Sequence, residues 1–457
     1  MKRRDFLKKA TLATAGSIVA PYILPSGRLF AGNNVQAAQH VVLVMFAGGV
    51  RHQEAALQGY LQLGQGIKYS SLNNANNAGN IMPSIFNGPA PDPTKTPIYY
   101  GTGTNGQNPI PPVISGSNSI ESLGTSFKEV RCLTSGHYAG WTAMLQGNSV
   151  SSQGLKQKPL YPTIFEYVRR EMGLPATKVW FCGTGIGASL PLLNYSEHPN
   201  YGAKYGANFF APLVTFGPQG QAWYKDAKAY DPTTELTPMY NLKSFLDRNF
   251  ENVGKPLPDL KNTEAEKYDI HNFMKLMYTK TDNNAVASPP GASNGDARTI
   301  GYCAELMKYF TPTLTVVNLG AVDGCHQNYT GYLQALHQAD HSVGWLWNYI
   351  QTQIPAMANN TVMLITPECG RDLNPNPIRD VNNYYSYDHS DANSLRTFTS
   401  IIGGNTPAGV VKGDPNNPIG YNTNVVPTIA EILGIKSQVV NAGFLAPGTQ
   451  SFYDLLP

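Results

Sequence analysis

Residues 313–319 read TLTVVNL and residues 361–365 read TVMLI, and these two short apolar runs decide the fold. Runs of this length that are rich in β-branched residues predict strands buried on both faces. The stretch between them, 329–354, has apolar residues at helical spacing, among them Leu336 and Val343, and predicts one long helix. Strand, helix and strand form a βαβ unit, so we expect two parallel strands joined by a right-handed crossover.

Further strands are predicted on both sides of this unit. Residues 40–46 read HVVLVMF, and shorter apolar runs occupy 130–133, 178–182 and 398–402. A short closing helix is predicted over 425–433. Together these elements predict an α/β fold, with a mostly parallel central sheet and helices on both of its faces.

Two stretches lack the regular pattern of a core. Residues 68–120 are rich in Asn, Gly, Pro and Ser, and residues 190–296 alternate aromatic-rich loops with helices near 241–250 and 263–280. We expect both to be loop-rich insertions. Residues 39–457 are therefore predicted to form a single α/β domain with these two insertions.

The amino terminus predicts export. Residues 2–8 read KRRDFLK, which resembles the twin-arginine motif, and an apolar stretch over 10–24 and small residues near Ala37 follow. We therefore interpret residues 1–38 as a twin-arginine signal peptide, recognised by the twin-arginine translocase, and expect a periplasmic or extracellular protein. The apolar stretch is shorter than the roughly 20 residues of a spanning helix, so no stable membrane anchor is expected.

Composition supports an exported protein and excludes some partners. Charged residues make up 14% of the chain, against roughly 25% in a typical soluble domain. The formal charge of +3 comes from the basic leader, and the remaining chain has slightly more acidic than basic side chains. This surface gives no electrostatic reason to bind nucleic acid. The five cysteines include no C-x-x-C pair, which excludes a zinc ribbon, and we expect Cys325 and Cys369 to lie near each other.

Chemically active side chains follow several of the predicted strands. In an open α/β sheet, sites form in the loops beyond the carboxyl ends of the strands. Here those loops read AGGVRH (47–52), TSGH (134–137), DGCH (323–326) and TPECGR (366–371), and DHS (388–390) precedes a later strand. Imidazole and carboxylate groups that converge from separate loops predict a divalent metal site for zinc, manganese or calcium.

In their order and strand context, these pieces resemble the alkaline phosphatase/sulfatase superfamily. The likeness is greatest to a twin-arginine-exported branch with a GG first strand, a D-x-H loop, a T/S-E-F-G-R strand end and a D-H-G/S loop. The resemblance implies an alkaline-phosphatase-like three-layer sandwich and a metal-dependent hydrolase-like protein that acts on a phosphate or sulfate ester. It also implies roles for five residues: Asp323, His326 and His389 as metal ligands, Glu368 as second-site ligand or general base, and Arg371 as the clamp for a small anionic substrate.

Three departures from the superfamily pattern leave it open whether this chain is an enzyme. Ala47 stands where hydrolytic members have a metal-binding Asp, and Glu368-Cys369 stands where they have an Asp-His pair. His137 occupies the place of their nucleophile. These departures support an alternative, in which the chain is a non-catalytic exported binding or assembly protein on the same fold.

The role of His137 has three alternatives. Imidazole can act as a nucleophile, it can replace the missing first-strand carboxylate as a metal ligand, or it can cap the helix that begins near residue 139. Thr134 and Ser135 remain reserve nucleophiles if the turn is displaced by two or three residues.

Overall fold

The computed structural model describes residues 22–23, 29–30, 36–56, 120–149, 158–185, 192–218, 220, 262–381 and 384–456. Its central feature is an eight-stranded sheet with the strand order β10-β4-β9-β8-β3-β7-β5-β6. The strands are β3 (His40–Phe46), β4 (Gly124–Arg131), β5 (Val179–Gly183), β6 (Asn208–Phe210), β7 (Leu314–Leu319), β8 (Thr361–Pro367), β9 (Arg396–Gly403) and β10 (Val410–Lys412). Of these, β9 runs antiparallel to both of its neighbours, and all other pairings are parallel.

The predicted βαβ unit is confirmed. Helix α10 (Tyr329–Gln353) connects β7 to β8, and both strands pair in parallel with β3, which lies between them. Leu43 at the middle of β3 is in register with Val316 on one side and Leu364 on the other. The two strands therefore belong to the same sheet, one strand apart.

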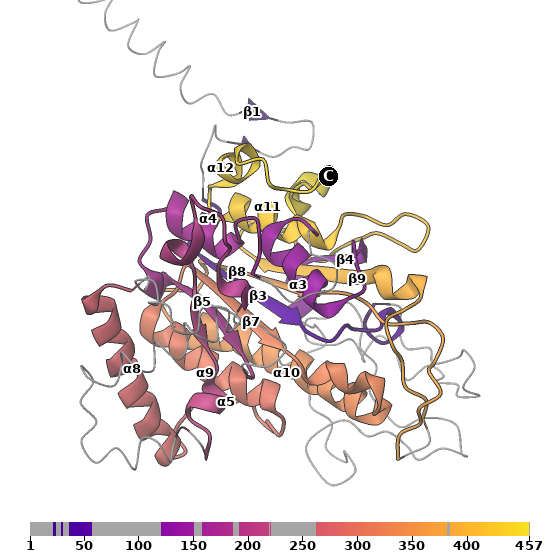
Figure 1. Ribbon diagram of the computed structural model, residues 1–457, viewed down its shortest axis with the longest axis horizontal. Helices are drawn as coiled ribbons and strands as arrows, with labels where there is room; N and C mark the ends of the chain where they lie inside the picture. The colour runs from indigo at the N-terminus through magenta and orange to yellow at the C-terminus, as the bar shows by residue number, and fades with distance from the viewer. Residues whose placement is uncertain are drawn as a thin grey trace, which may run out of the picture.

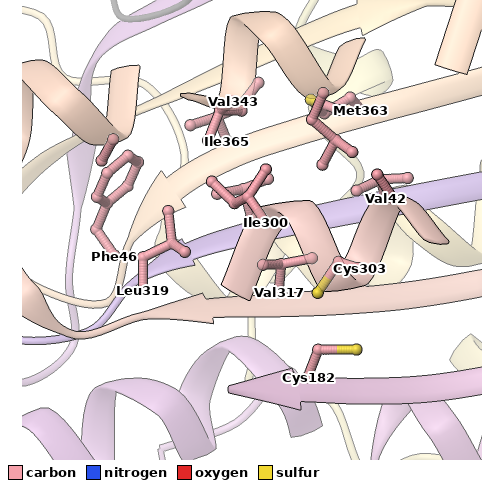
Figure 2. Packing of buried hydrophobic residues seen from close by; sticks show 14 of the residues in the cluster. Val42, Phe46, Cys182, Ile300, Cys303, Val317, Leu319, Val343, Met363 and Ile365 are labelled. Atoms are coloured by element: carbon pink, nitrogen blue, oxygen red, sulfur yellow. The ribbon is translucent and has the colours of Figure 1, made fainter. Parts of the chain in front are cut away.

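Helices cover both faces of the sheet, as the buried strands predict (Figure 1). One layer contains α8 (Glu264–Asp282), α9 (Gly295–Phe310) and α10, and the other contains α3 (His137–Gln146), α4 (Ile164–Glu171), α11 (Val425–Ile432) and α12 (Lys436–Asn441). Successive side chains of β3 alternate between the two layers, so Val42 and Val44 enter one core and Val41 and Leu43 the other. Figure 2 shows part of the first core, where Ile300 and Cys303 of α9 lie over the strands.

Shorter elements complete the described chain. The short helices are α2 (His52–Ala55) and α5 (Pro212–Thr215), and a two-residue pair, β1 (Tyr22–Ile23) with β2 (Leu29–Phe30), is separate from the main sheet. The 3₁₀ turns are η2 (Ile120–Leu123), η3 (Ala176–Lys178), η5 (Gly202–Tyr205), η6 (Ala321–His326), η7 (Ala392–Leu395), η8 (Asn422–Asn424) and η9 (Phe452–Leu455). None of the described helices is long and apolar enough to cross a membrane.

The structure corrects one strand boundary and adds one strand. The run predicted at 130–133 begins earlier, at Gly124, because the polar side chains of this strand are buried and paired, as Ser126 is with Ser400. Within the predicted insertion 190–296, β6 joins the edge of the main sheet beside β5. The predicted insertion 68–120 lies outside the described residues apart from Ile120, as does the helix expected near 241–250.

Candidate metal centre

The loops singled out in the sequence meet at one edge of the sheet. The loops after β3, β4, β7 and β8 leave the carboxyl ends of strands that share one direction. Because β9 runs the opposite way, the loop before it arrives at the same edge. This arrangement brings six predicted site residues into one cluster: His137, Asp323, His326, Glu368, Arg371 and His389.

His137 lies at the centre of the cluster, in the first turn of α3. Its Nδ1 is 2.9 Å from Glu368 Oε1, and its Nε2 is 3.1 Å from Asp323 Oδ1 without the alignment of a hydrogen bond. Burial lowers the pKa of His137, but the two carboxylates outweigh it and raise that pKa to about 9. The ring makes no capping contact with the helix, whose N-cap is Gly136. The contacts of His137 therefore do not support the helix-capping alternative.

Asp323 and His326 project from the same side of the 3₁₀ turn η6. Such a turn has three residues per turn, so residues three apart lie above one another. The Nε2 atom of His326 is 3.4 Å from Asp323 Oδ1. Burial raises the pKa of Asp323, but the neighbouring imidazoles of His137 and His326 outweigh it and, with the charge of Arg371, hold that pKa well below its usual range. The carboxylate of Asp323 is therefore ionised at neutral pH.

Asp388 orients His326, a role that was not predicted from the sequence. Its Oδ1 lies 2.5 Å from Nδ1 of His326. A carboxylate at one ring nitrogen of a histidine fixes the tautomer and leaves the other nitrogen free to bind a metal. The available signal was the position of Asp388 next to His389 in the DHS loop.

His389 completes a group of three imidazoles. Its ring centroid is 4.2 Å from that of His137 and 5.0 Å from that of His326. Burial lowers the pKa of His389 to about 4, and the nearby charges of His137 and Arg371 act in the same direction. His389 is therefore neutral at physiological pH, which is the form that binds metals.

Glu368 contacts His137 of this group and is fully buried. Its Oε1 accepts hydrogen bonds from the backbone N–H groups of Gly48, at 2.5 Å, and Gly49, at 3.2 Å. These two glycines have φ values of +117° and +73°, and a Cβ on Gly48 would lie 2.4 Å from Cβ of Asp323. The turn after Ala47 thus provides backbone donors to the Glu368 carboxylate.

Cys369 adds a buried sulfur atom to the cluster. Its Sγ is 3.7 Å from Nδ1 of His137, and the side chain is fully buried. Burial, then the charge of Glu368, raises the pKa of Cys369 well above its ordinary value, so the free side chain is a thiol and not an activated nucleophile. Cys325 is also buried, and burial raises the pKa of its thiol as well. The positive charge of Arg371 acts in the opposite direction on the pKa values of both Cys325 and Cys369.

The structure gives Arg371 a different set of partners from those of the expected anion clamp. The guanidinium is fully buried, and it donates to the backbone oxygens of Gly48, Gly49 and Tyr387. Its Nη2 also lies 2.9 Å from Asp323 Oδ1. Because each of its three nitrogens is engaged with this framework, the geometry favours a structural role for Arg371 over direct contact with a substrate.

Asp372 holds the loop that contains His389, and no sequence signal indicated it. Its carboxylate accepts hydrogen bonds from the Ser390 backbone N–H at 2.5 Å, the Ser390 hydroxyl at 2.7 Å and the Asp391 N–H at 2.6 Å. Its own N–H donates to the backbone oxygen of Asp388. Asp372 therefore fixes the loop eighteen residues further along the chain.

Two sets of donors in the described residues have the spacing of a metal site. One consists of His137, His326 and His389, and the other of His137, Glu368 and Cys369; within each set the donor atoms lie within 4.8 Å of one another. The first set faces the partly exposed side of the cluster, where Asp323 adds a carboxylate. Imidazole nitrogen with carboxylate oxygen suits zinc and related divalent ions, so these residues fit a bound metal.

No protein-family model matches this sequence, and no curated protein matches it. Among solved structures, the chain is similar to a protein in the alkaline phosphatase superfamily from Vibrio parahaemolyticus, with 9% identity and a TM-score of 0.41. That match covers 95% of this chain and 76% of the other.

Two further solved structures are similar in fold. The TAB5 alkaline phosphatase has 12% identity and a TM-score of 0.39, with 87% of this chain and 99% of that chain covered. A phosphonate monoester hydrolase from Silicibacter pomeroyi has 13% identity and a TM-score of 0.37, with 74% of this chain and 70% of that chain covered.

Proposed function

We propose that this chain is an exported, metal-dependent hydrolase-like protein that acts on a phosphate or sulfate ester. The observation that supports it most is the convergence of Asp323, His326 and His389 beside His137, from loops far apart in the sequence. Convergent carboxylate and imidazole groups at the carboxyl edge of a parallel sheet are typical of a metal-dependent active site.

In this proposal Asp323, His326 and His389 hold the metal, which supplies Lewis acidity to the ester oxygen. Asp388 keeps Nδ1 of His326 engaged, so that Nε2 faces the metal position. Arg371, which is fully buried, donates a hydrogen bond to the Asp323 carboxylate and holds it in place. His389 contributes a neutral imidazole without having to lose a proton first.

His137 acts as a ligand or positioning group in this proposal, in preference to a nucleophile. Its two ring nitrogens face the carboxylates of Glu368 and Asp323, which favour the protonated imidazole, so the metal-free ring has no lone pair for nucleophilic attack. It becomes a ligand only when a metal ion displaces one of these protons. Glu368 then serves as the general base or as a ligand of a second metal. Thr134, whose hydroxyl accepts a hydrogen bond from the Gly136 N–H, and Ser135 remain the reserve nucleophiles.

A second candidate function, a non-catalytic binding or assembly protein, is favoured by the surroundings of Glu368. The backbone N–H groups of Gly48 and Gly49 occupy its Oε1, and Ala47 offers no ligand atom. Arg371 is likewise engaged by the framework. A site with these features is able to hold a metal and a ligand without turning the ligand over.

We also propose that the twin-arginine translocase exports the folded chain to the periplasm or beyond the cell. The proposal rests on the KRRDFLK sequence at residues 2–8, which lies outside the described residues.

Metal analysis combined with an ester panel tests the proposal. The protein purified without chelators should contain near-stoichiometric zinc, manganese or calcium and should hydrolyse a phosphate or sulfate ester. Asp323→Ala should lose both, whereas the control Asp269→Asn, on the exposed face of α8, should keep both. Metal without turnover across the panel would favour the non-catalytic candidate, and absence of metal would overturn the hydrolase proposal.

A further inference from the structure

We propose that His137, Glu368 and Cys369 form a second, inner metal position with a thiolate ligand, one that selects zinc or cobalt over magnesium and calcium. The donors are of three kinds, a ring nitrogen, a carboxylate oxygen and a sulfur, and all lie within 4.8 Å of one another. This position differs from the outer one in both its ligands and its burial. The proposal holds whether or not the chain hydrolyses an ester.

The spacing of the donors matches a tetrahedral ion. Zinc lies about 2.0 Å from nitrogen and about 2.3 Å from sulfur, so two such ligands at the tetrahedral angle are about 3.5 Å apart. Sγ of Cys369 and Nδ1 of His137 are 3.7 Å apart. Nδ1 and Glu368 Oε1 are 2.9 Å apart, which is a hydrogen-bond distance, so the oxygen that Glu368 offers to an ion is Oε2.

Glu368 retains one free oxygen for the ion. Its Oε1 is engaged by Gly48, Gly49 and His137, while Oε2 is buried and has no hydrogen-bond partner among the described residues. A buried carboxylate oxygen without a partner is unfavourable, because it has lost its hydration and gained nothing in return. A metal at the inner position supplies that missing partner.

The two nitrogens of His137 separate the inner position from the outer one. Nδ1 faces Glu368 and Cys369, whereas Nε2 faces Asp323. The inner donors Glu368 and Cys369 are fully buried, while the side chains of Asp323 and His326 are 51% and 30% exposed. Ion binding at the inner position releases the protons of Cys369 Sγ and His137 Nδ1 to solvent, which makes both atoms ligands.

Sulfur ligation determines which metals the inner position takes. Thiolate is a soft ligand that suits zinc and related transition metals, whereas magnesium and calcium prefer oxygen ligands. The outer position has no sulfur among its donors. A spectroscopic signal from a metal–sulfur bond therefore reports on the inner position alone.

Cobalt titration of the full-length protein tests this proposal. Cobalt(II) should produce a near-ultraviolet thiolate-to-cobalt charge-transfer band that is absent in Cys369→Ser. The band should remain in Cys325→Ser, a control whose thiol is equally buried but lies outside the donor set. It should also remain in Asp323→Ala, which removes an outer ligand, so loss of the outer site and loss of the inner site are distinguishable.

X-ray absorption of the zinc-loaded wild-type protein provides a test that needs no variant. One sulfur scatterer at about 2.3 Å from zinc is expected. Zinc bound only through nitrogen and oxygen would overturn the proposal, as would a cobalt charge-transfer band that persists in Cys369→Ser. Failure of the wild-type protein to bind either metal would overturn it as well.

Discussion

Nδ1 of His326 lies 2.5 Å from Oδ1 of Asp388, although the two residues are 62 positions apart in the chain. The contact joins the turn after β7 to the loop before β9. It leaves Nε2 of His326 directed toward Asp323. The orientation of one proposed metal ligand thus depends on a carboxylate that contributes no ligand atom in this proposal.

Asp388→Asn should weaken metal binding by about 10- to 100-fold, because the amide cannot fix the imidazole as the carboxylate does. The fold should be unaffected, since the Asp388 side chain is 45% exposed. Competition titration against a chelator of known affinity measures the change. An unchanged dissociation constant would show that Asp388 does not act through His326.

Arg371→Lys should destabilise the protein by about 3–5 kcal/mol, because a lysine cannot replace the planar group that donates to Gly48, Gly49 and Tyr387. Denaturant unfolding at neutral pH measures the loss. If the variant keeps wild-type stability and changes only the affinity for an anion, Arg371 is the substrate clamp after all.

Gly48→Ala should disturb the outer metal position. The new Cβ would lie 2.4 Å from Cβ of Asp323, and the backbone φ of +117° is unfavourable for alanine. We expect a loss of about 1–3 kcal/mol in stability together with weaker metal binding. Gly443→Ala is a matched control, because Gly443 also has a positive φ, of +78°, but its Cβ would meet nothing within 4 Å. Weakened metal binding in both variants would refute the local explanation.

Acid should destabilise the protein partly through Glu129. This carboxylate is buried, receives a hydrogen bond from Arg396 and lies 3.0 Å from Nε2 of His52. Burial raises the pKa of Glu129, but these partners outweigh it and lower the pKa to about 2, from an ordinary value of 4.5. The folded-state pKa is the lower one, so the stabilisation is complete above pH 4.5 and declines as the pH falls toward 2.

Denaturant unfolding between pH 7 and pH 2 measures this decline, which should be on the order of 2 kcal/mol. Burial lowers the pKa of His52 from its ordinary value of 6.5. Protonation of His52 therefore causes a separate loss of stability, which begins as the pH falls below 6.5. In Glu129→Gln the decline between pH 4.5 and 2 should be smaller than in the wild type. An equal decline in both proteins would show that the ionisation of Glu129 does not contribute.

Local sequence patterns predicted the centre of the sheet well. The run at 40–46 matches β3 at both ends, and the helix predicted over 329–354 ends within one residue of α10. Both are long, regular patterns that a buried strand or an amphipathic helix requires. β4 was harder to predict, because Ser126 and Glu129 are polar but buried, and their partners lie in distant parts of the chain.

The sequence by itself determined which side chains stand at the strand ends, because strand direction places His137, Asp323 and Glu368 beyond carboxyl ends that meet at one edge. Only the tertiary structure decided what each of them contacts. In the folded chain Arg371 donates to backbone oxygens, Asp388 contacts His326, and Cys369 contacts His137. These contacts join segments that are 16, 62 and 232 residues apart. They depend on the packing of whole loops, whereas local sequence patterns report only on neighbouring residues.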